Sequence, residues 1–324
     1  MEFSKKIFEI DPEETALRIE KFIRDTVKHT YHGKGIVIGL SGGVDSAAAC
    51  ALSVRALGAE RVCGLLLPER DSNPVSREYA LMVVKSLGIP YEEIEITPML
   101  GSFNVYGKRN AIVKHVFPGL DGPYKFRLVL PQDLLDRDRL NVYHLEVLCD
   151  DGSVLRKRLS HQAYLELMAA NDIKQRTRMI QLHYEAEKRN YIVCGTTNYS
   201  ETVQGFFVKY GDGVVDIEPI ADLYKSHVYQ LARYLDIPEE IIARSPSPDT
   251  YSYEVSDEEF YFCLPYELVD HIIYAIDHKV PRERVSEVFG LTREQVDRAW
   301  KELTHRRTMT EHLRANPPTP GIKW

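Results

Sequence analysis

The segment Ile36–Leu52 constrains the fold more than any other part of the chain, because it joins an apolar run, a glycine turn and a run of helix formers. Ile36–Gly39 has the character of a buried strand, and Ala47–Leu52 has the composition of a helix. Gly42 and Gly43 between them let the backbone approach a ligand closely. A helix start of this kind offers unpaired N–H groups and a positive dipole end, which stabilise a bound phosphate.

Hydroxyl and carboxylate side chains flank this turn. Ser41 and Ser46 add hydroxyl donors, whereas the Asp45 carboxylate would repel phosphate unless a divalent cation lay between them. The pattern therefore predicts a pyrophosphate group bound together with Mg²⁺. It is neither the nucleotide loop with a lysine after its second glycine nor the dinucleotide fingerprint with three spaced glycines. An ordinary turn between a strand and a helix is the alternative, which two adjacent glycines with hydroxyls and an acid do not favour.

The alternation of strands and helices predicts an α/β fold. Strands are expected at 36–39, 62–68, 91–96 and 191–194, and helices at 11–30, 44–58, 76–88, 163–190, 226–236, 257–276 and 282–302, the last broken at Gly290. Such alternation produces a doubly wound parallel sheet with helices on both faces. Ligands of these sheets bind outside the carboxyl ends of the strands, where the glycine turn lies.

Residues 101–160 interrupt the alternation with clustered glycines and prolines around extended runs at 124–130, 143–149 and 154–159. The last two runs, joined by an Asp-Asp-Gly-Ser turn, read as a hairpin. The sequence thus predicts a single domain spanning 1–324 with an antiparallel β insertion at about 101–160.

Composition narrows the class of protein further. The 324 residues are 44% hydrophobic and 27% charged, without the roughly 20-residue apolar run of a membrane helix. No secretory segment opens the chain, so we expect a cytoplasmic protein. The net charge of −7 argues against a protein that coats nucleic acid. Five scattered cysteines without a CxxC pair suggest neither a zinc site nor a disulfide framework.

The motifs, taken in order, carry a resemblance to a known family. The segment Ser41–Ser46 resembles the loop of N-type ATP pyrophosphatases, which cleave ATP between its α and β phosphates. The order and spacing of the later motifs resemble the NAD synthase family. These motifs are Gln175-Arg176-Thr177-Arg178-Met179, Gly195-Thr196 with Glu201, Lys209-Tyr210-Gly211-Asp212-Gly213 with Asp216, and Leu223-Tyr224-Lys225. The resemblance implies an adenine nucleotide alpha hydrolase-like fold.

The resemblance also implies roles for individual residues. The ATP site would comprise Gly39, Leu40, Ser41, Gly42, Gly43, Val44, Asp45 and Ser46, together with Thr196, Lys225 and Ser247. Asp45 and Glu201 would bind Mg²⁺, and with Lys225 they would form the catalytic set. Deamido-NAD would contact Arg176, Lys209 and Asp216. Plainer interpretations are a solvated helix arginine for Arg176 and a helix-end charge for Lys225.

Two segments depart from the family pattern. Pro246-Ser247-Pro248-Asp249-Thr250 replaces the usual Pro-Thr-Ala-Asp-Leu, so Ser247 would supply the hydroxyl of the ATP site. The family's His-Lys pair near the C-terminus has His305-Arg306 or His312-Leu313 as counterparts. We prefer His305-Arg306 as contacts for deamido-NAD because Arg307 continues its basic run.

The activity implied is that of a ligase that amidates deamido-NAD to NAD, through an acyl-adenylate, with release of AMP and pyrophosphate. The start Met1-Glu2 lacks the cysteine of an N-terminal nucleophile glutaminase. The nitrogen donor would therefore be free ammonia, or ammonia that a separate glutaminase chain supplies. The family suggests a homodimer, for which aromatic residues between Tyr251 and Tyr274 offer an interface or simply a core. The alternatives are a related ATP pyrophosphatase or amide ligase that adenylates a different small carboxylate, and a non-catalytic nucleotide-binding module.

Overall fold

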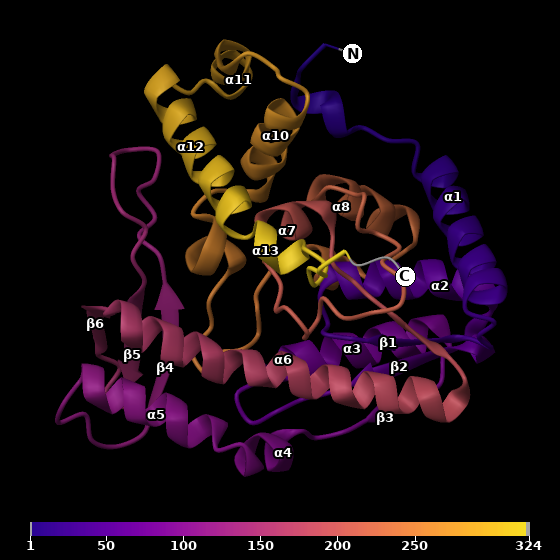
Figure 1. The fold of residues 1–324 in the computed structure, drawn as a ribbon, viewed down its shortest axis with the longest axis horizontal. Helices are drawn as coiled ribbons and strands as arrows, with labels where there is room; N and C mark the ends of the chain where they lie inside the picture. Colours follow the sequence, from indigo (N-terminus) through magenta and orange to yellow (C-terminus); the bar gives the residue numbers. More distant parts are fainter. Residues whose placement is uncertain (1, 322–324) are drawn as a thin grey trace.

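A parallel sheet with strand order β3-β2-β1-β7 organises the computed structural model, which describes residues 2–321 (Figure 1). Its strands are β1 (Ile36–Gly39), β2 (Val62–Leu66), β3 (Tyr91–Glu93) and β7 (Ile192–Cys194). Beyond β7 the edge continues only as a bridge between Cys194 and Ile217. The strand order reverses between β1 and β7, and ligands of open α/β sheets bind at such a switch point.

Helices cover both faces of this sheet because successive strand residues point to opposite sides. Ile36 and Ile38 pack against α1 (Pro12–Asp25), α2 (Val44–Leu57), α3 (Pro74–Leu87) and α8 (Lys225–Tyr234). Val37, Leu65 and Val193 pack against the other layer, formed by α4 (Thr97–Ser102), α5 (Val105–Val116) and α6 (His161–Arg189). The predicted doubly wound fold is confirmed.

The predicted antiparallel strands are present as β4 (Tyr124–Val129), β5 (His144–Cys149) and β6 (Val154–Arg158). They lie beside the amino-terminal end of α6 (Figure 1). The segment 101–160 also contains the end of α4 and the whole of α5, two helical parts that the sequence interpretation did not assign. Gly101 and Gly107 made the segment look irregular in sequence. Val105, Ile112, Val113 and Val116 nevertheless have helical spacing, and all four are buried.

The C-terminal part is helical and packs with the N-terminal residues Phe3 and Phe8 as a second core. It contains α10 (Tyr266–Asp277), α11 (Arg282–Phe289), α12 (Arg293–Met309) and α13 (Glu311–Arg314). The single helix expected at 257–276 is divided, with a π-helical turn at Glu258–Phe262 and a new start after Pro265, because proline fits the beginning of a helix better than its interior.

Further short helices are α7 (Tyr199–Gln204), α9 (Glu239–Ile242), two 3₁₀ turns at Lys5–Phe8 and Ala59–Arg61, and a π-helical turn at Thr26–Thr30. The break at Gly290 is confirmed, and its φ of 64° is the left-handed conformation that favours glycine after a helix. The aromatic residues Phe260 and Phe262 are buried within the chain, which explains them as core residues. Within residues 2–321, no helix is long and apolar enough to cross a membrane.

Candidate active site

A cavity of about 630 Å³ opens at the carboxyl ends of β1 and β7. Segments far apart in the sequence line it: the turn after β1, the start of α3, α6, the residues after β7, the start of α8 and the segment 244–251. The cavity brings together most of the residues predicted from sequence. These are Gly39, Leu40, Ser41, Gly43, Val44, Asp45, Ser46, Arg176, Thr196, Glu201, Lys209, Lys225 and Ser247.

The turn between β1 and α2 is held by its own hydroxyls. Ser41 Oγ accepts a hydrogen bond from Gly43 N at 3.2 Å, and Ser46 Oγ donates to Gly43 O at 3.0 Å. Gly42 adopts a φ of 76°, and a Cβ there would lie 2.3 Å from the Ser76 carbonyl oxygen, so the position requires glycine. Gly43 begins α2 without a side-chain cap, which leaves first-turn amides for an anion.

Asp45, Glu201 and Lys225, which we call the cavity cluster, meet at the start of α2, α7 and α8. Lys225 Nζ donates to Asp45 Oδ2 and lies 3.4 Å from Glu201 Oε1. The lysine side chain is 2% exposed, against 17% and 14% for the two carboxylates. One ammonium therefore faces two carboxylates, and the cluster lacks one positive charge.

The pKa shifts in the cavity cluster follow from burial and from the charges of its members. Burial, and then the charge of Asp45, raise the pKa of Glu201 to about 8. Burial alone would lower the pKa of Lys225, but Asp45 and Glu201 outweigh it and raise that pKa above its ordinary value. The lysine is thus fixed as an ammonium.

Asn198, to which the sequence interpretation gave no role, connects the two carboxylates of the cavity cluster. Its Nδ2 donates to Asp45 Oδ1 at 3.0 Å, and its Oδ1 accepts from Glu201 N at 3.1 Å. Glu201 Oε2 in return accepts from Asn198 N at 3.3 Å, so that the pair forms a capping box at the start of α7. An Asn followed three residues later by Glu is the sequence signal that would have identified it.

A third acid, Asp257, also lines the cavity and was missed. Its Oδ2 accepts from Tyr266 at 2.9 Å, whereas its buried Oδ1 has no hydrogen-bond partner. Burial raises the pKa of Asp257 to about 6. Among residues 2–321, no three His, Cys, Asp or Glu side chains lie close enough to hold a metal ion. A cation at Asp45 and Glu201 would therefore need further oxygen ligands from phosphate or water.

Cationic side chains occupy another part of the cavity wall. Arg176 donates through Nε and Nη2 to the Lys209 carbonyl oxygen at 3.3 and 3.2 Å, and Lys209 Nζ donates to His312 O at 2.7 Å. Arg178 and Arg244 line the cavity as well, and sequence analysis gave them no role. The second arginine of the Arg-x-Arg motif was the available signal for Arg178.

Four predicted residues do not line the cavity. Gly42 supports the turn from behind, as described above. Asp216 Oδ2 instead accepts from Val193 N at 2.8 Å at the edge of the sheet. His305 is exposed on α12, and the buried Arg306 pairs with Glu302 at 2.7 Å and lies 4.4 Å from the Tyr261 ring. Arg306 is therefore behind the cavity wall that Tyr261 forms.

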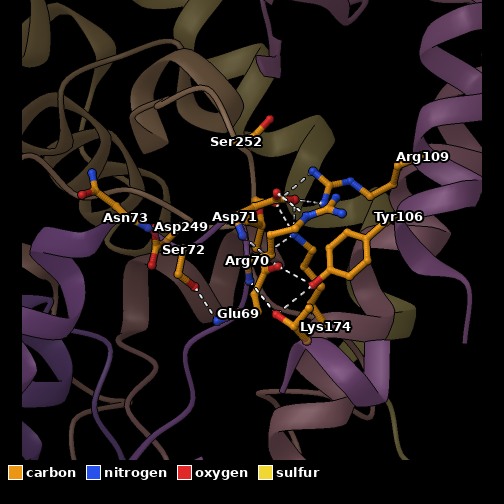
Figure 2. A network of polar contacts seen from close by, with 12 residues as sticks. Glu69, Arg70, Asp71, Ser72, Asn73, Tyr106, Arg109, Lys174, Asp249 and Ser252 are labelled. Atoms are coloured by element: carbon orange, nitrogen blue, oxygen red, sulfur yellow. Dashed lines mark hydrogen bonds and ion pairs between the residues drawn. The ribbon is translucent and has the colours of Figure 1, made fainter. Parts of the chain in front are cut away.

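A second group of charges, which we call the wall network, joins Glu69 and Asp71 of the loop after β2 to Arg109 of α5 and Lys174 of α6 (Figure 2). Arg109 Nη1 donates to Asp71 Oδ2 at 2.6 Å, and Lys174 Nζ pairs with Glu69 Oε1. Both cations also donate to the Thr250 carbonyl oxygen, at 3.3 and 2.8 Å. The network thus ties α5, α6 and the loop after β2 to the segment 245–251, which lines the cavity.

The fold and the cavity together define a class of protein. Amides at a glycine turn, with carboxylates and a buried ammonium beside them at the switch point of a doubly wound sheet, are typical of an α/β protein that binds phosphate groups. A family model described as NAD synthase matches residues 15–116 and 143–317. The chain belongs to the NAD synthase family. Between the two matched parts, only residues 117–142 lie outside the match.

Individual relatives agree with this assignment. The NH(3)-dependent NAD(+) synthetase of Mesorhizobium japonicum is 40% identical over 300 residues, which cover 93% of this chain and 94% of that protein. Among solved structures, the NMN synthetase of Francisella tularensis aligns with a TM-score of 0.67 at 23% identity, over 97% of this chain and 100% of that chain. The NH3-dependent NAD synthetase of Campylobacter jejuni aligns with a TM-score of 0.62 at 24% identity, over 96% and 99%. The structural matches support the fold.

Proposed function

We propose that this chain is a ligase that converts deamido-NAD to NAD with ATP and ammonia. The nicotinate carboxylate attacks the α phosphorus of ATP, which forms an acyl-adenylate and releases pyrophosphate. Ammonia then attacks the acyl carbon, which forms the amide and releases AMP. The observation that carries the proposal is the cavity cluster beside a phosphate-binding turn, in a chain of the NAD synthase family.

The ATP side of the cavity follows from its donors. We propose that the amides from Gly39 to Ser46 and the hydroxyls of Thr196 and Ser247 bind ATP, and that the Lys225 ammonium meets its phosphates. None of these side chains forms a covalent bond to substrate in this scheme. The protein acts by positioning the reactants and by neutralising charge that develops on the leaving pyrophosphate.

We propose Asp45 and Glu201 as ligands for Mg²⁺. The residues fit a divalent cation, because both carboxylates border the cavity, are partly exposed and share a single ammonium. Oxygen ligands from one or two carboxylates, completed by phosphate and water, are the set that Mg²⁺ prefers. When bound, the ion would neutralise charge on the ATP phosphates.

The dinucleotide side rests on Arg176 and Lys209, which both line the cavity. We propose that their charges meet the pyrophosphate or carboxylate of deamido-NAD. Contact of Asp216, His305 and Arg306 with deamido-NAD stays a prediction, and it requires the ligand to extend beyond the cavity walls. The homodimer, the cytoplasmic location and a separate glutaminase chain as ammonia source likewise stay predictions.

Mass spectrometry of products tests the proposed function. The protein is incubated with ATP, Mg²⁺ and ammonium, and with deamido-NAD, nicotinate mononucleotide or other small carboxylates in parallel. We expect NAD and AMP in equal amounts from deamido-NAD, and much slower turnover of nicotinate mononucleotide, which lacks the adenylate half. AMP release with another carboxylate, and none with deamido-NAD, would establish the alternative amide ligase instead.

A further inference from the structure

We infer that Asp270, a buried carboxylate on α10 that does not line the cavity, is a positioning residue for Glu201 and Lys225. The inference rests on the proposed function for the identity of the reaction, and on the contacts of Asp270 for the positioning itself. Asp270 is 0% exposed. Its partners are the two serines that adjoin the cavity cluster in sequence, Ser200 and Ser226.

The contacts of Asp270 join two helix starts. Oδ1 accepts from Ser200 Oγ at 2.5 Å, and Oδ2 accepts from Ser226 N and Ser226 Oγ at 2.8 and 2.6 Å. Ser200 Oγ in turn accepts from Lys225 N at 3.1 Å. One carboxylate therefore links α7 and α8 at the turns that carry Glu201 and Lys225.

Asp270 adds a side-chain link to the backbone hydrogen bond that already joins these helix starts, in which Tyr199 N donates to Leu223 O at 2.8 Å. α7 has only six residues, and α8 begins without a side-chain cap from its own N-cap residue, Tyr224. Asp270 supplies that cap from another helix, because it accepts the free amide of Ser226 in the first turn of α8. A carboxylate at a helix start is also stabilised by the helix dipole.

The reaction depends on the relative position of these helix starts. Glu201 and Lys225 lie 3.4 Å apart and would share the ATP phosphates and the cation. A displacement of about 1 Å in such a site can lower turnover by roughly 100-fold. Asp270→Asn keeps the size of the side chain, but it removes the negative charge and replaces one acceptor oxygen by an amide nitrogen that cannot accept the hydrogen bond donated by a serine, so that the link between the two helix starts is weakened.

Asp277 provides a matched control on the same helix. It accepts from Tyr199 of α7 at 2.7 Å and pairs with Arg307 of α12. Like Asp270 it is a carboxylate hydrogen-bonded to α7, but its side-chain partners do not include α8. Asp277→Asn therefore removes an acid from α10 without removing the link between Glu201 and Lys225.

The test compares Asp270→Asn and Asp277→Asn with the wild type by thermal unfolding, by calorimetric binding of Mg²⁺-ATP and by steady-state kinetics. We expect Asp270→Asn to lose roughly 10-fold or more in Mg²⁺-ATP affinity and roughly 100-fold in kcat. The KM for deamido-NAD should stay within about 2-fold, since Arg176 and Lys209 are unaffected. Asp277→Asn should keep the affinity and kcat of the wild type within about 3-fold.

A second variant keeps the inference testable if Asp270→Asn does not fold. Ser200→Ala removes the hydroxyl that joins Asp270 to Lys225 N, and should lower Mg²⁺-ATP affinity and kcat in the same direction by a smaller factor. Equal losses of stability in Asp270→Asn and Asp277→Asn, with Mg²⁺-ATP affinity and kcat unchanged in both, would overturn the inference. Failure of the wild type to form NAD would contradict the proposed function, while the Mg²⁺-ATP affinities would still test the positioning.

Discussion

The cavity cluster and the wall network are both groups of largely buried charges, and they differ in the number of cations available to each acid. In the wall network, Glu69 and Asp71 face Arg109 and Lys174, so that two acids meet two cations. In the cavity cluster, two carboxylates share the single ammonium of Lys225. Buried charges are stable when they are paired, so the acids and cations of the wall network balance, whereas the cavity cluster has one acid more than it has cations.

The pKa values of the carboxylates reflect the same difference. Burial alone would raise the pKa of Asp71, but Lys174 and Arg109 outweigh it and lower that pKa below its ordinary value. Burial and Asp45 raise the pKa of Glu201 to about 8 despite Lys225. The comparison shows that burial of an acid does not by itself mark a functional site. We propose that the functional site is marked instead by Glu201, an acid that borders the cavity and has too little positive charge around it.

The largest effect should follow from removal of a cavity-cluster carboxylate. Asp45→Asn or Glu201→Gln should lower kcat at least ~1,000-fold, because charge on the leaving phosphates would lose the proposed cation. The free energy of unfolding should stay the same or rise, because repulsion between the two acids is relieved. Steady-state assays and urea denaturation measure both quantities. Near-normal turnover in either variant would remove that residue from the cation site.

Removal of a charge from the wall network should lower the free energy of unfolding and leave kcat nearly unchanged. Arg109→Met leaves Asp71 without one of its cations, and breaking such a buried pair costs about 3–5 kcal/mol of unfolding free energy. The folded fraction should keep a kcat within a few-fold of the wild type, since Arg109 does not line the cavity. Urea denaturation measures the loss, and Lys108→Met on the exposed side of α5 is the control. A large loss of kcat without a loss of stability would contradict a structural role.

Opposite pH dependences sharpen the comparison. Burial raises the pKa of Glu218, which accepts a hydrogen bond from Thr197 N after β7, to about 8, whereas the pKa of Asp71 in the wall network is lowered. The contribution of Glu218 to stability is therefore present below its ordinary pKa and is lost as pH rises toward 8, by at most about 1.4 kcal/mol per pH unit. That of Asp71 is present at neutral pH and is lost as pH falls below its ordinary pKa.

Unfolding curves between pH 3 and pH 9 test these signs. Glu218→Gln should flatten the decline between about pH 5 and pH 8, and Asp71→Asn should flatten the decline in acid. The two variants serve as controls for each other. If Glu218→Gln left the slope above pH 5 unchanged, the assignment of that slope to Glu218 would be wrong.

The smallest effect concerns substrate selection within the cavity. Lys209→Ala should raise the KM for deamido-NAD roughly 10-fold and leave the KM for ATP nearly unchanged, because a single charge-assisted contact to the dinucleotide is lost. Lys225→Met is the matched comparison, since it should impair ATP binding instead. Kinetics with each substrate varied in turn separate the two. An equal rise in both KM values for Lys209→Ala would refute its assignment to the dinucleotide side.

Much of the fold was predictable because its signals are local. Apolar runs predicted the strands, and helix-end residues such as Pro12 and Gly290 predicted where helices begin and end. Their alternation predicted the doubly wound sheet, whose strands end at the edge where the cavity cluster lies. Helix α5 was missed because Gly107 interrupts an otherwise helical apolar spacing. The division of the expected helix at 257–276 had a local signal in Pro265, which disfavours a helix interior, and the sequence interpretation did not use it.

The remainder of the site depends on orientation and on distant partners. His305 and Arg306 are adjacent in sequence, but neighbouring helix residues point about 100° apart, so one is exposed and the other is buried. Motif spacing does not give this helical phase. Asp270 and the wall network depend on pairings such as Lys174 with Glu69, which are 105 positions apart. A single sequence contains no signal for such a pairing.

Transfer of oxygen from substrate to AMP tests the central claim most directly. Deamido-NAD labelled with ¹⁸O in its nicotinate carboxylate is incubated with ATP, Mg²⁺ and ammonium, and the AMP is analysed by mass spectrometry. Attack of the carboxylate on the α phosphorus predicts one ¹⁸O in each AMP formed alongside NAD, and no labelled AMP from Asp45→Asn. Formation of NAD with unlabelled AMP would contradict the acyl-adenylate mechanism.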